Sequence, residues 1–406
     1  MTGQRFSGLR ATVMGLGTRA GGVGVARYLA EAGAIVTVTD NKPAAALAQP
    51  MAALADLPIR FVLGGHDERH FTPAGADLIV RNPGVRRDAP LLQLARRHGL
   101  PVEMEMTIFF RACPAPIVGI TGTKGKTSTA TLCAAMLRAW DQRTVLAGNM
   151  GVSALARLSE ITPDTPVVLE LSSWQLEGLA EHRLAPRVAV LTMIAEDHLD
   201  AYDSFDDYAD TKRSIGRAQT PADDLVLNRD DPQTWRATEG TPATIVPFGQ
   251  QDREEDGAWV TDRSLRWRWR GEQDCVELPA TPALLGAHNA ANAAAAMASA
   301  RRRGAPHEAI VAGLGTYQGV QDRMEPVAEV NGVRYINDTS ATAPVAAAAA
   351  AGVGDVVLLS PGCASFGLFR DEFDRGEQFR RSVREIAAEA ARHAQSGASI
   401  ASGTDR

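Results

Sequence analysis

Residues 116–140 read PIVGITGTKGKTSTATLCAAMLRAW, which predicts a strand, a Gly-rich turn and a helix in succession. The apolar run Pro116–Ile120 is typical of a buried strand, and apolar residues return at helical spacing after the turn. A Gly-rich turn that opens a helix directs several backbone N–H groups and the positive end of the helix dipole to one point. The stretch therefore predicts a polyphosphate site, with Lys126 at the β/γ-phosphates and the Thr127 hydroxyl on Mg²⁺.

The turn is a variant of the common phosphate loop. The common pattern places a glycine five residues before Gly125, where this chain has Ile120. A turn that only caps a helix is the alternative, but it would need neither the lysines nor three glycines. The candidate ATP-binding residues of the loop are Gly122, Thr123, Lys124, Gly125, Lys126, Thr127 and Ser128.

The composition is that of an ordinary globular protein. The chain has 406 residues, 22% of them charged, with a net charge of −6, so two to four domains are expected and no basic face for nucleic acid. The N-terminal residues lack an apolar signal core, and no apolar run is long enough to span a membrane. We therefore expect a cytoplasmic protein. The four scattered cysteines, Cys113, Cys133, Cys275 and Cys363, predict free thiols rather than a zinc site or disulfides.

Residues 10–40 read RATVMGLGTRAGGVGVARYLAEAGAIVTVTD and predict a strand, a Gly-rich turn, a helix and a second strand. The spacing from Gly15 to Gly21 departs by one residue from the dinucleotide fingerprint, although Asp40 stands where a ribose-binding acid would stand. A dehydrogenase is therefore one alternative. We expect a Rossmann-like domain over residues 1–111, with its ligand at the carboxyl ends of the strands.

In the central region, apolar runs within 144–151, 166–177 and 187–202 predict buried parallel strands. Polar residues begin where each run stops, so they should gather at the sheet edge that carries the phosphate loop. Residues 265–270 alternate strictly between Arg and apolar residues, which favours an antiparallel edge strand over a nucleic-acid site. The polar residues of the edge are Asn149, Glu170, Ser172, Ser173, Asp197 and His198.

From residue 284 the chain predicts an Ala-rich helix on which Asn289 and Asn292 share one face. These amides suit an adenine edge, although helix capping would explain Asn289 equally well. Residues 313–319 are expected to form a linker that closes a central domain of residues 112–318. A strand, an alanine run, another strand and an amphipathic helix follow over residues 319–406, and the tail after residue 394 is expected to fray.

Six motifs occur in one order along the chain: GITGTKGKTS, ELSSWQLE, EDHLD, GAHNAANAAAA, DRME and YINDTSAT. With these motifs in this order, the sequence resembles the Mur ligase family. Among the members of that family, it resembles the glutamate-adding ligases most. The resemblance implies three α/β domains that bind a UDP-sugar, ATP, and the amino acid with part of the nucleotide. It implies the addition of glutamate to UDP-N-acetylmuramoyl-L-alanine in peptidoglycan precursor synthesis, with ADP and phosphate as products. A monomer is expected.

The resemblance also implies a catalytic set of Lys126, His198 and Lys212. Thr127 and Glu170 would hold one Mg²⁺, while His198 and a carbamylated Lys212 would hold a second. Carbamylation converts an ammonium, which would repel Mg²⁺, into an anion that can bind it. Without the resemblance, His198 and Lys212 would be assigned as an ordinary strand-end histidine and a surface lysine.

Further site residues follow from matching motifs. Arg323 would contact phosphate and Asp338 the ribose, beside the adenine-binding Asn289 and Asn292. The UDP-sugar would meet Gly15, Gly17, Asp40, Asn41 and Asn82; the rest of that substrate would meet Asn149, Ser172 and Ser173; and the amino acid would meet Thr342, Ser365 and Phe373, or Phe369 in its place.

The chain departs from the family at two points. Glutamate-adding ligases commonly carry a lysine where Ser340 stands, so the preferred glutamate could be the D form, our choice, or the L form. The third domain is short, because only 87 residues remain from Val320. The sequence therefore predicts a three-domain α/β ligase with a shortened Rossmann-like C-terminal domain. The rival of another class is an inactive or regulatory nucleotide-binding homologue.

Overall fold

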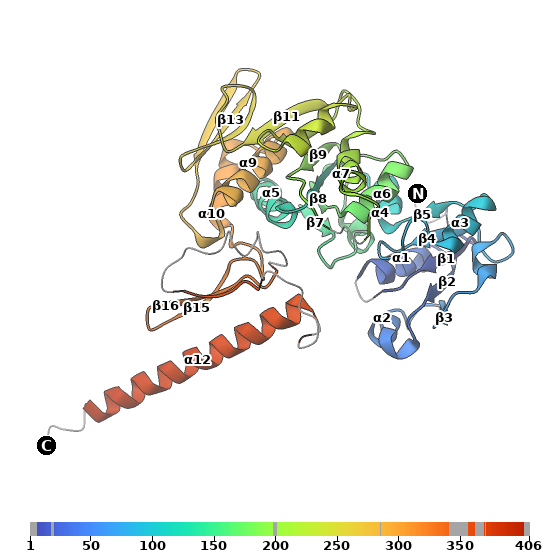
Figure 1. Cartoon of the computed structure of the whole chain (residues 1–406), viewed down its shortest axis with the longest axis horizontal. Coiled ribbons are helices and arrows are strands. Elements are labelled where there is room, and N and C mark those ends of the chain that lie inside the picture. Colours follow the sequence, from blue (N-terminus) through green and yellow to red (C-terminus); the bar gives the residue numbers. More distant parts are fainter. Residues whose placement is uncertain are drawn as a thin grey trace. The chain divides into compact units, whose positions relative to one another are not determined.

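The computed structural model describes residues 6–17, 20–197, 201–284, 286–340, 356–361, 369 and 371–401. Within them, the strands form three β-sheets, each packed against helices (Figure 1). The chain divides into two units, one of Met1–Glu277 with Ala291–Gly315 and one of Leu278–Ala290 with Thr316–Arg406. Each unit is described by itself.

The first sheet is parallel, with strand order β3-β2-β1-β4-β5. The predicted strand, turn, helix and strand over residues 10–40 are confirmed as β1, α1 and β2. The strand order reverses beside β1, which is where open α/β sheets bind ligands. The elements are β1 Arg10–Met14, α1 Ala20–Glu31, β2 Ile35–Asp40, α2 Ala48–Ala52, β3 Arg60–Leu63, β4 Leu78–Arg81, α3 Pro90–Arg97 and β5 Val102–Glu103.

The second sheet has nine strands in the order β14-β13-β12-β11-β10-β9-β6-β8-β7 and is parallel from β7 to β12. β6, which precedes the phosphate loop, lies between β8 and β9, so the carboxyl ends of all three strands meet at one edge. Its strands are β6 Ile117–Thr121, β7 Val145–Gly148, β8 Val167–Glu170, β9 Val188–Leu191, β10 Asp224–Asn228, β11 Thr244–Gly249, β12 Gly257–Thr261, β13 Ser264–Trp269 and β14 Glu272–Glu277. Its helices are α4 Glu105–Ala112, α5 Lys126–Trp140, α6 Ser173–Glu181, α7 Phe205–Arg213, α8 Pro232–Trp235, α9 Ala287–Arg302 and α10 His307–Thr316.

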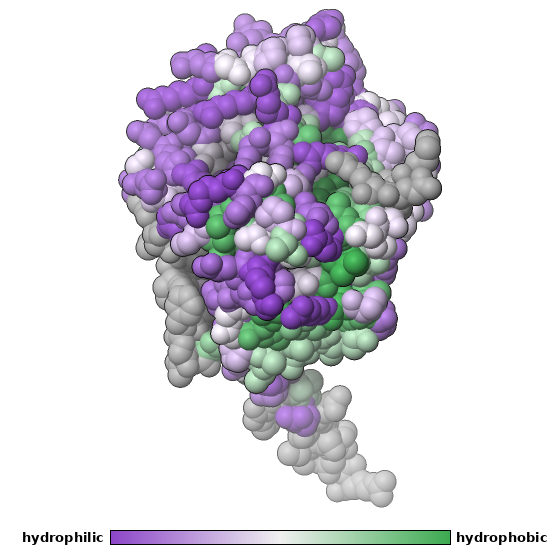
Figure 2. Space-filling model, turned by 90° about the vertical axis from the view of Figure 1, so that its right-hand side faces the viewer, coloured by the Kyte–Doolittle hydropathy of each residue, from purple (hydrophilic) through white to green (hydrophobic). Residues whose placement is uncertain are grey.

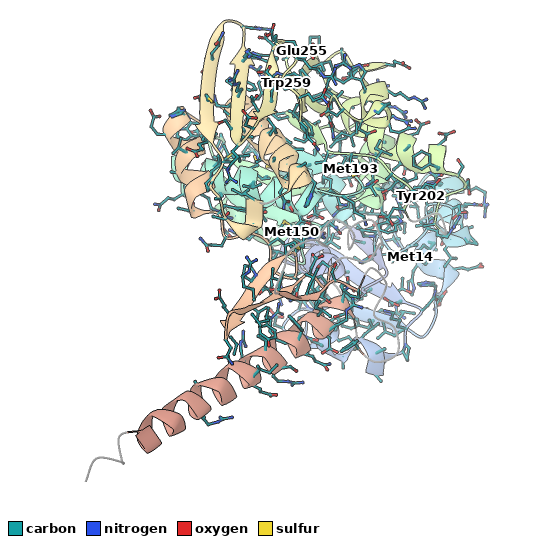
Figure 3. All side chains as sticks on the ribbon, turned by 60° about the vertical axis from the view of Figure 1, so that its left-hand side comes forward. Met14, Met150, Met193, Tyr202, Glu255 and Trp259 are labelled. Atoms are coloured by element: carbon teal, nitrogen blue, oxygen red, sulfur yellow. The ribbon has the colours of Figure 1, made fainter. Side chains whose placement is uncertain are left out.

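The antiparallel prediction for residues 265–270 is confirmed, but their prediction as an edge strand is wrong. β13 pairs with β12 on one side and with β14 on the other, so β14 is the edge. Trp267 on β13 and Trp259 on β12 are fully buried, and Figure 3 labels Trp259 in this antiparallel extension. β14 was not predicted as a strand because its sequence, EQDCVE, contains few apolar residues.

The predicted linker over residues 313–319 is also wrong in its first half. Gly313 lies inside α10, and a Cβ at this position would clash with the backbone of Met136 on α5. The glycine therefore permits two helices to approach closely, which a linker does not require.

Among the described residues, the third sheet has three strands in the order β15-β16-β17, packed on helix α12. The C-terminal region is thus short, as the sequence predicted. α12 continues to Ala401, beyond the point where the tail was expected to fray (Figure 1). The elements are β15 Glu325–Val330, β16 Val333–Asn337, β17 Val356–Leu359 and α12 Glu372–Ala401.

Hydrophilic residues dominate the face of the molecule shown in Figure 2, and hydrophobic residues gather there in smaller patches. Over the described part of the chain, no helix is both long and apolar enough to cross a membrane. Cys113, Cys133 and Cys275 are free thiols, as predicted, and Cys363 lies outside the described residues.

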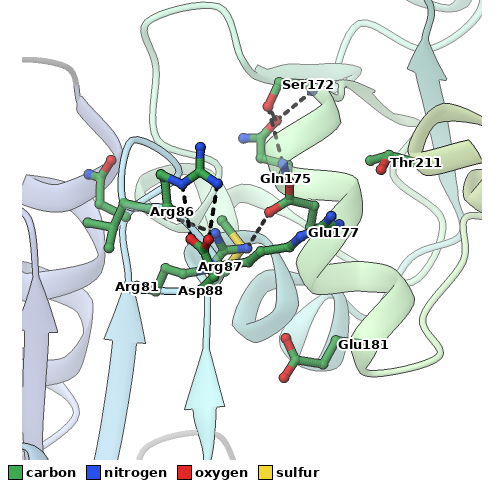
Figure 4. A network of polar contacts seen from close by, with 12 residues as sticks. Arg81, Arg86, Arg87, Asp88, Ser172, Gln175, Glu177, Glu181 and Thr211 are labelled. Carbon is green, nitrogen blue, oxygen red and sulfur yellow. Dashed lines mark hydrogen bonds and ion pairs between the residues drawn. The ribbon is translucent and has the colours of Figure 1, made fainter. Parts of the chain in front are cut away.

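A buried ion pair joins the first sheet to helix α6 of the second. The Arg81 guanidinium, only 1% exposed, donates to the Glu177 carboxylate at 2.9 Å and to the Val85 carbonyl at 2.8 Å (Figure 4). Arg81 ends β4, so the same contacts fix the turn that begins at Asn82.

Replacing Glu177 with alanine should lower the free energy of unfolding by about 3 kcal/mol, because a buried guanidinium loses its carboxylate. The matched control is Glu181→Ala, one turn along α6. Glu181 pairs with Arg96 at 3.1 Å on the surface, and its loss should cost less than about 1 kcal/mol. Urea unfolding measures both values, and equal losses would contradict a structural role for the buried pair.

Candidate functional site

The turn between β6 and α5 depends on two glycines. Gly125 has φ +86° and precedes the first residue of α5, and Gly122 has φ +147°. A Cβ on Gly125 would clash with the Asn292 amide, and one on Gly122 with the Thr192 hydroxyl. Only glycine satisfies both the backbone angle and the space at these positions. The predicted strand, loop and helix are confirmed here.

The segment after β9 holds this loop. The Thr123 N–H donates to the Met193 carbonyl at 2.7 Å, and the Ala195 N–H donates to the Thr123 hydroxyl at 3.0 Å. The Thr192 hydroxyl donates to the Lys124 carbonyl at 2.6 Å, and the Tyr208 hydroxyl lies 3.1 Å from that of Thr123. Met193 is labelled in Figure 3. Thr192 and Tyr208 were not among the residues predicted from the sequence, although Tyr208 stands one helical turn before Lys212.

The Lys126 ammonium folds back over the loop. It donates to the carbonyls of Gly122 and Thr123, both at 2.9 Å. These are carbonyls of the same turn whose N–H groups would face a phosphate. The ammonium is therefore already placed at the turn that a polyphosphate would occupy.

Two hard oxygen donors meet beside the loop. The Thr127 hydroxyl donates to Glu170 Oε2 at 2.8 Å, and the Asn149 amide donates to Glu170 Oε1 at 2.9 Å. Glu170 ends β8 and is 3% exposed. Neighbouring oxygens around an octahedral Mg²⁺ lie about 3 Å apart, so this pair fits the ion. Thr127 and Glu170 would hold it.

Lys212 lies on α7 with its side chain buried, and its ammonium is 4.9 Å from the centre of the Tyr208 ring. Burial, assisted by the positive charge of Lys126, holds the pKa of Lys212 well below its ordinary value. Glu170 and Asp197 act on it in the opposite direction. The structure thus brings Lys212 within electrostatic reach of the loop lysines and of Glu170.

The lysine content makes this convergence informative. The chain has four lysines against 38 arginines, and three of the four are Lys124, Lys126 and Lys212. A lysine is a compact charge that can lose its proton, whereas arginine stays charged. Three of the four lysines of the chain are thus concentrated at this site.

The predicted UDP-sugar residues gather at the carboxyl ends of β1, β2 and β4. Asp40 Oδ2 accepts the N–H groups of Leu16 at 2.9 Å and Gly17 at 3.1 Å, so this carboxylate shapes the glycine turn itself. A Cβ on Gly15 would press against Asn82, whose side chain accepts the Gly84 N–H. Asn41 follows Asp40 and is exposed.

Ser172 and Ser173 are buried at the start of α6. Ser172 is the N-cap: its hydroxyl accepts the Gln175 N–H, and the Gln175 side chain accepts the Ser172 N–H at 2.9 Å. This capping box gives Ser172 a local structural role.

The second unit carries Arg323 and Asp338. Arg323 is exposed, whereas Asp338 is buried; it accepts the Met324 N–H at 3.1 Å and the Ser360 hydroxyl at 2.7 Å. Burial raises the pKa of Asp338, and the charges of Arg323 and His288 oppose this.

Asn289 and Asn292 lie on α9, which begins at Ala287, so Asn289 stands inside the helix rather than at its cap. Asn292 is buried and its amide oxygen lies 3.4 Å from the Thr129 hydroxyl of α5.

The remaining predicted residues are only partly described. Phe373 lies in the first turn of α12 and is 53% exposed, and Phe369 is half-buried. Ser340 donates its N–H to the Asp322 carbonyl at 3.0 Å. The predictions for His198, Thr342 and Ser365 lie outside the described residues.

Comparisons with known proteins find two matching domains and several similar ligases. The Mur ligase middle domain matches residues 120–300, and the N-terminal domain of MurD-like Mur ligases matches residues 9–103. The UDP-N-acetylmuramoylalanine–D-glutamate ligase of Roseiflexus sp. (strain RS-1) is 41% identical over 93% of this chain and 99% of its own length. The ligase of the same name from Geobacter metallireducens is 34% identical over 94% of this chain and 98% of its length. The Roseiflexus alignment spans 464 positions against the 406 residues here, so that relative has segments that this chain lacks.

One solved structure with the same fold is the UDP-N-acetylmuramate:L-alanyl-gamma-D-glutamyl-meso-diaminopimelate ligase from Neisseria meningitides. It aligns with a TM-score of 0.54 and 21% identity, covering 77% of this chain and 99% of its own. At this identity the likeness concerns the fold alone.

Proposed function

This chain belongs to the Mur ligase family, and from that premise we propose that it joins D-glutamate to UDP-N-acetylmuramoyl-L-alanine in an ATP-dependent reaction of peptidoglycan precursor synthesis. The observation that carries the proposal is the meeting of the phosphate loop, the Thr127–Glu170 pair and the buried Lys212 at one sheet edge. Residues 1–111 would bind the UDP-sugar, residues 112–318 ATP, and residues 319–406 the amino acid with part of the nucleotide.

The first step activates a carboxylate, which is a poor electrophile. The carboxylate of UDP-N-acetylmuramoyl-L-alanine attacks the γ-phosphorus of ATP in line, and the bond to the β-phosphate oxygen breaks. ADP departs and an acyl phosphate is formed. The loop N–H groups and Lys126 hold the triphosphate and neutralise its charge. Bound Mg²⁺ would supply further neutralisation of the phosphate oxygens.

The second step forms the amide. The neutral glutamate amine attacks the acyl carbonyl and a C–N bond forms. Inorganic phosphate leaves with the electrons of the C–O bond, and the nitrogen gives up a proton, which the departing phosphate can accept. Holding the three reactants in one geometry supplies most of the rate. Lys212, as a carbamate, and His198 would hold a second Mg²⁺, which would neutralise further charge on the reacting groups.

Glutamate-dependent release of phosphate from ATP plus UDP-N-acetylmuramoyl-L-alanine tests the function. We expect turnover that requires all three substrates. ATP binding without turnover would overturn the ligase proposal in favour of a nucleotide-binding homologue without catalysis.

The amino-acid preference is a separate prediction. With Ser340 at the position of the usual lysine, hydroxyls and N–H groups would have to bind the side-chain carboxylate of the glutamate substrate. We therefore expect weaker glutamate binding, with D-glutamate still preferred. A competition assay with D-glutamate, L-glutamate, aspartate and lysine at equal concentration gives the ratios of kcat/KM. Preference for L-glutamate would refute the stereochemical prediction and leave the ligase mechanism intact.

A further inference from the structure

A buried polar cluster lies beneath the loop that carries Arg323. The Arg380 guanidinium of α12 donates to Asp322 Oδ1 and to Glu325 Oε2, both at 2.8 Å. The Asn337 amide donates to the same two carboxylates, at 2.8 Å and 3.1 Å. The side chains of Arg380 and Asp322 are 6% and 3% exposed. One guanidinium from the end of the chain thus holds two carboxylates that flank Arg323.

The backbone around Arg323 needs such support. Asp322 has φ +63° and Met324 has φ +44°, in a region that residues with a Cβ rarely adopt. Left-handed residues of this kind persist only when their surroundings hold them. The Asp322 carbonyl accepts the Ser340 N–H at 3.0 Å, and the Met324 N–H donates to Asp338 at 3.1 Å.

α12 also holds the strand end on the other side of this loop. Arg375 Nε donates to the Thr339 hydroxyl at 2.8 Å and its Nη2 to the Thr339 carbonyl at 2.9 Å. Thr339 follows Asp338 directly. Next to Arg375, α12 lies very close to the loop that carries Arg323, since a Cβ on Gly376 would clash with the Asp322 side chain.

We propose that Arg380 is a positioning residue for ATP: it fixes the loop of residues 320–324 so that the exposed Arg323 and the nearby Asp338 are presented together to the nucleotide. The inference rests on the proposed function, in which these two residues contact phosphate and ribose. On this proposal, α12 holds in place the loop of residues 320–324 and the strand end at Thr339, which lie beside the residues that would contact the nucleotide.

The chemistry of the cluster makes Arg380 hard to replace. Its Nη1 donates to both Asp322 and Glu325, while its Nε and Nη2 donate to Glu377 at 3.0 Å and 2.8 Å, so one planar group serves three carboxylates. Without it, two neighbouring carboxylates would face each other across the Asn337 amide with no cation between them, and the loop would rearrange to separate them.

The test compares Arg380→Met with Arg380→Lys and with Arg323→Met, and uses Arg384→Met as the control. Arg384 lies one turn further along α12 and is exposed. ATP affinity is measured by calorimetry without the amino acid, and KM values are measured for ATP and for UDP-N-acetylmuramoyl-L-alanine. Far-UV circular dichroism monitors folding, and Arg380→Lys supplies the test if the methionine variant does not fold.

We expect Arg380→Met to lower kcat/KM for ATP about a hundredfold, as a small misplacement of a binding group can. The ATP affinity of Arg380→Met should fall to about the same extent as that of Arg323→Met, and Arg380→Lys should lose less affinity than Arg380→Met. KM for the UDP-sugar should not change, whereas a merely structural role would reduce the active fraction without altering either KM.

The failures are distinguishable. Unchanged ATP affinity in the folded Arg380 variants, with a loss in Arg323→Met, would overturn the positioning role and leave the proposed function intact. Unchanged affinity in Arg323→Met would overturn the inference at its premise. ATP binding with the expected pattern but no glutamate-dependent turnover would support the positioning role and overturn the ligase proposal.

Discussion

Replacing Lys126 with alanine is expected to lower kcat about a thousandfold or more, because the transferring phosphoryl group loses its nearest cation in a preorganised site. The ammonium already lies 2.9 Å from two carbonyls of the loop, so little reorganisation accompanies its contact with phosphate. Steady-state phosphate release with all three substrates measures the effect.

The matched control for Lys126→Ala is Arg143→Ala. Arg143 lies just beyond the other end of α5 and forms a surface ion pair with Asp141, so its loss should leave kcat unchanged. Near-normal activity in Lys126→Ala would refute the assignment of residues 122–128 as the phosphate loop. A loss confined to ATP affinity, with kcat intact, would show that Lys126 binds the ground state and transition state equally.

Replacing Lys212 with alanine should lower kcat by about a hundredfold, the upper end of the range seen when a group that supports a metal site is removed. Small carboxylates such as formate or acetate should restore part of the activity, because they can supply the anionic oxygens of the missing carbamate. The low pKa of the buried amine favours this modification, since only the neutral amine reacts with carbon dioxide.

Lys212→Arg and Arg217→Ala complete the comparison. Arginine keeps the positive charge but cannot form the carbamate, so Lys212→Arg should be as inactive as Lys212→Ala. Arg217 is exposed, and its loss should have no effect. With four lysines in the chain, isotope-labelled bicarbonate can be assigned to one of them directly. Full activity in Lys212→Ala, or label on another lysine, would refute the carbamate hypothesis.

The phosphate loop and the sheets around it could be predicted because their signals are local. Backbone angles at Gly122 and Gly125, the apolar strand Ile117–Thr121 and the helix after it all follow from neighbouring residues. The motifs were also sufficient to indicate the family, since their order along the chain needs no knowledge of contacts. The prediction of residues 265–270 as an edge strand failed because β14, the actual edge, has few apolar residues and so gives little signal of a strand in the sequence.

Other features depended on residues far apart in the sequence. Gly313 was predicted to lie in a linker, but it permits α10 to pack closely against Met136, and this contact cannot be inferred from neighbouring residues. Asp40 matched a ligand-binding position, and only the fold shows its carboxylate capping the turn at Leu16 and Gly17. Arg380 lies 58 residues from Asp322, and nothing in the helix sequence marks it among the neighbouring arginines.

Sequence alone therefore determined the strand, turn and helix at the phosphate loop, the similar unit over residues 10–40 and the types of side chain available for chemistry, because these follow from the spacing of residues along the chain. Tertiary structure decided which of those side chains are buried and which charges they face. Lys212 is the clearest case: its residue type was known, but its shifted pKa arises from burial by several elements and from Lys126, 86 positions earlier. Burial and electric field are sums over spatial neighbours, and only the folded chain brings those neighbours together.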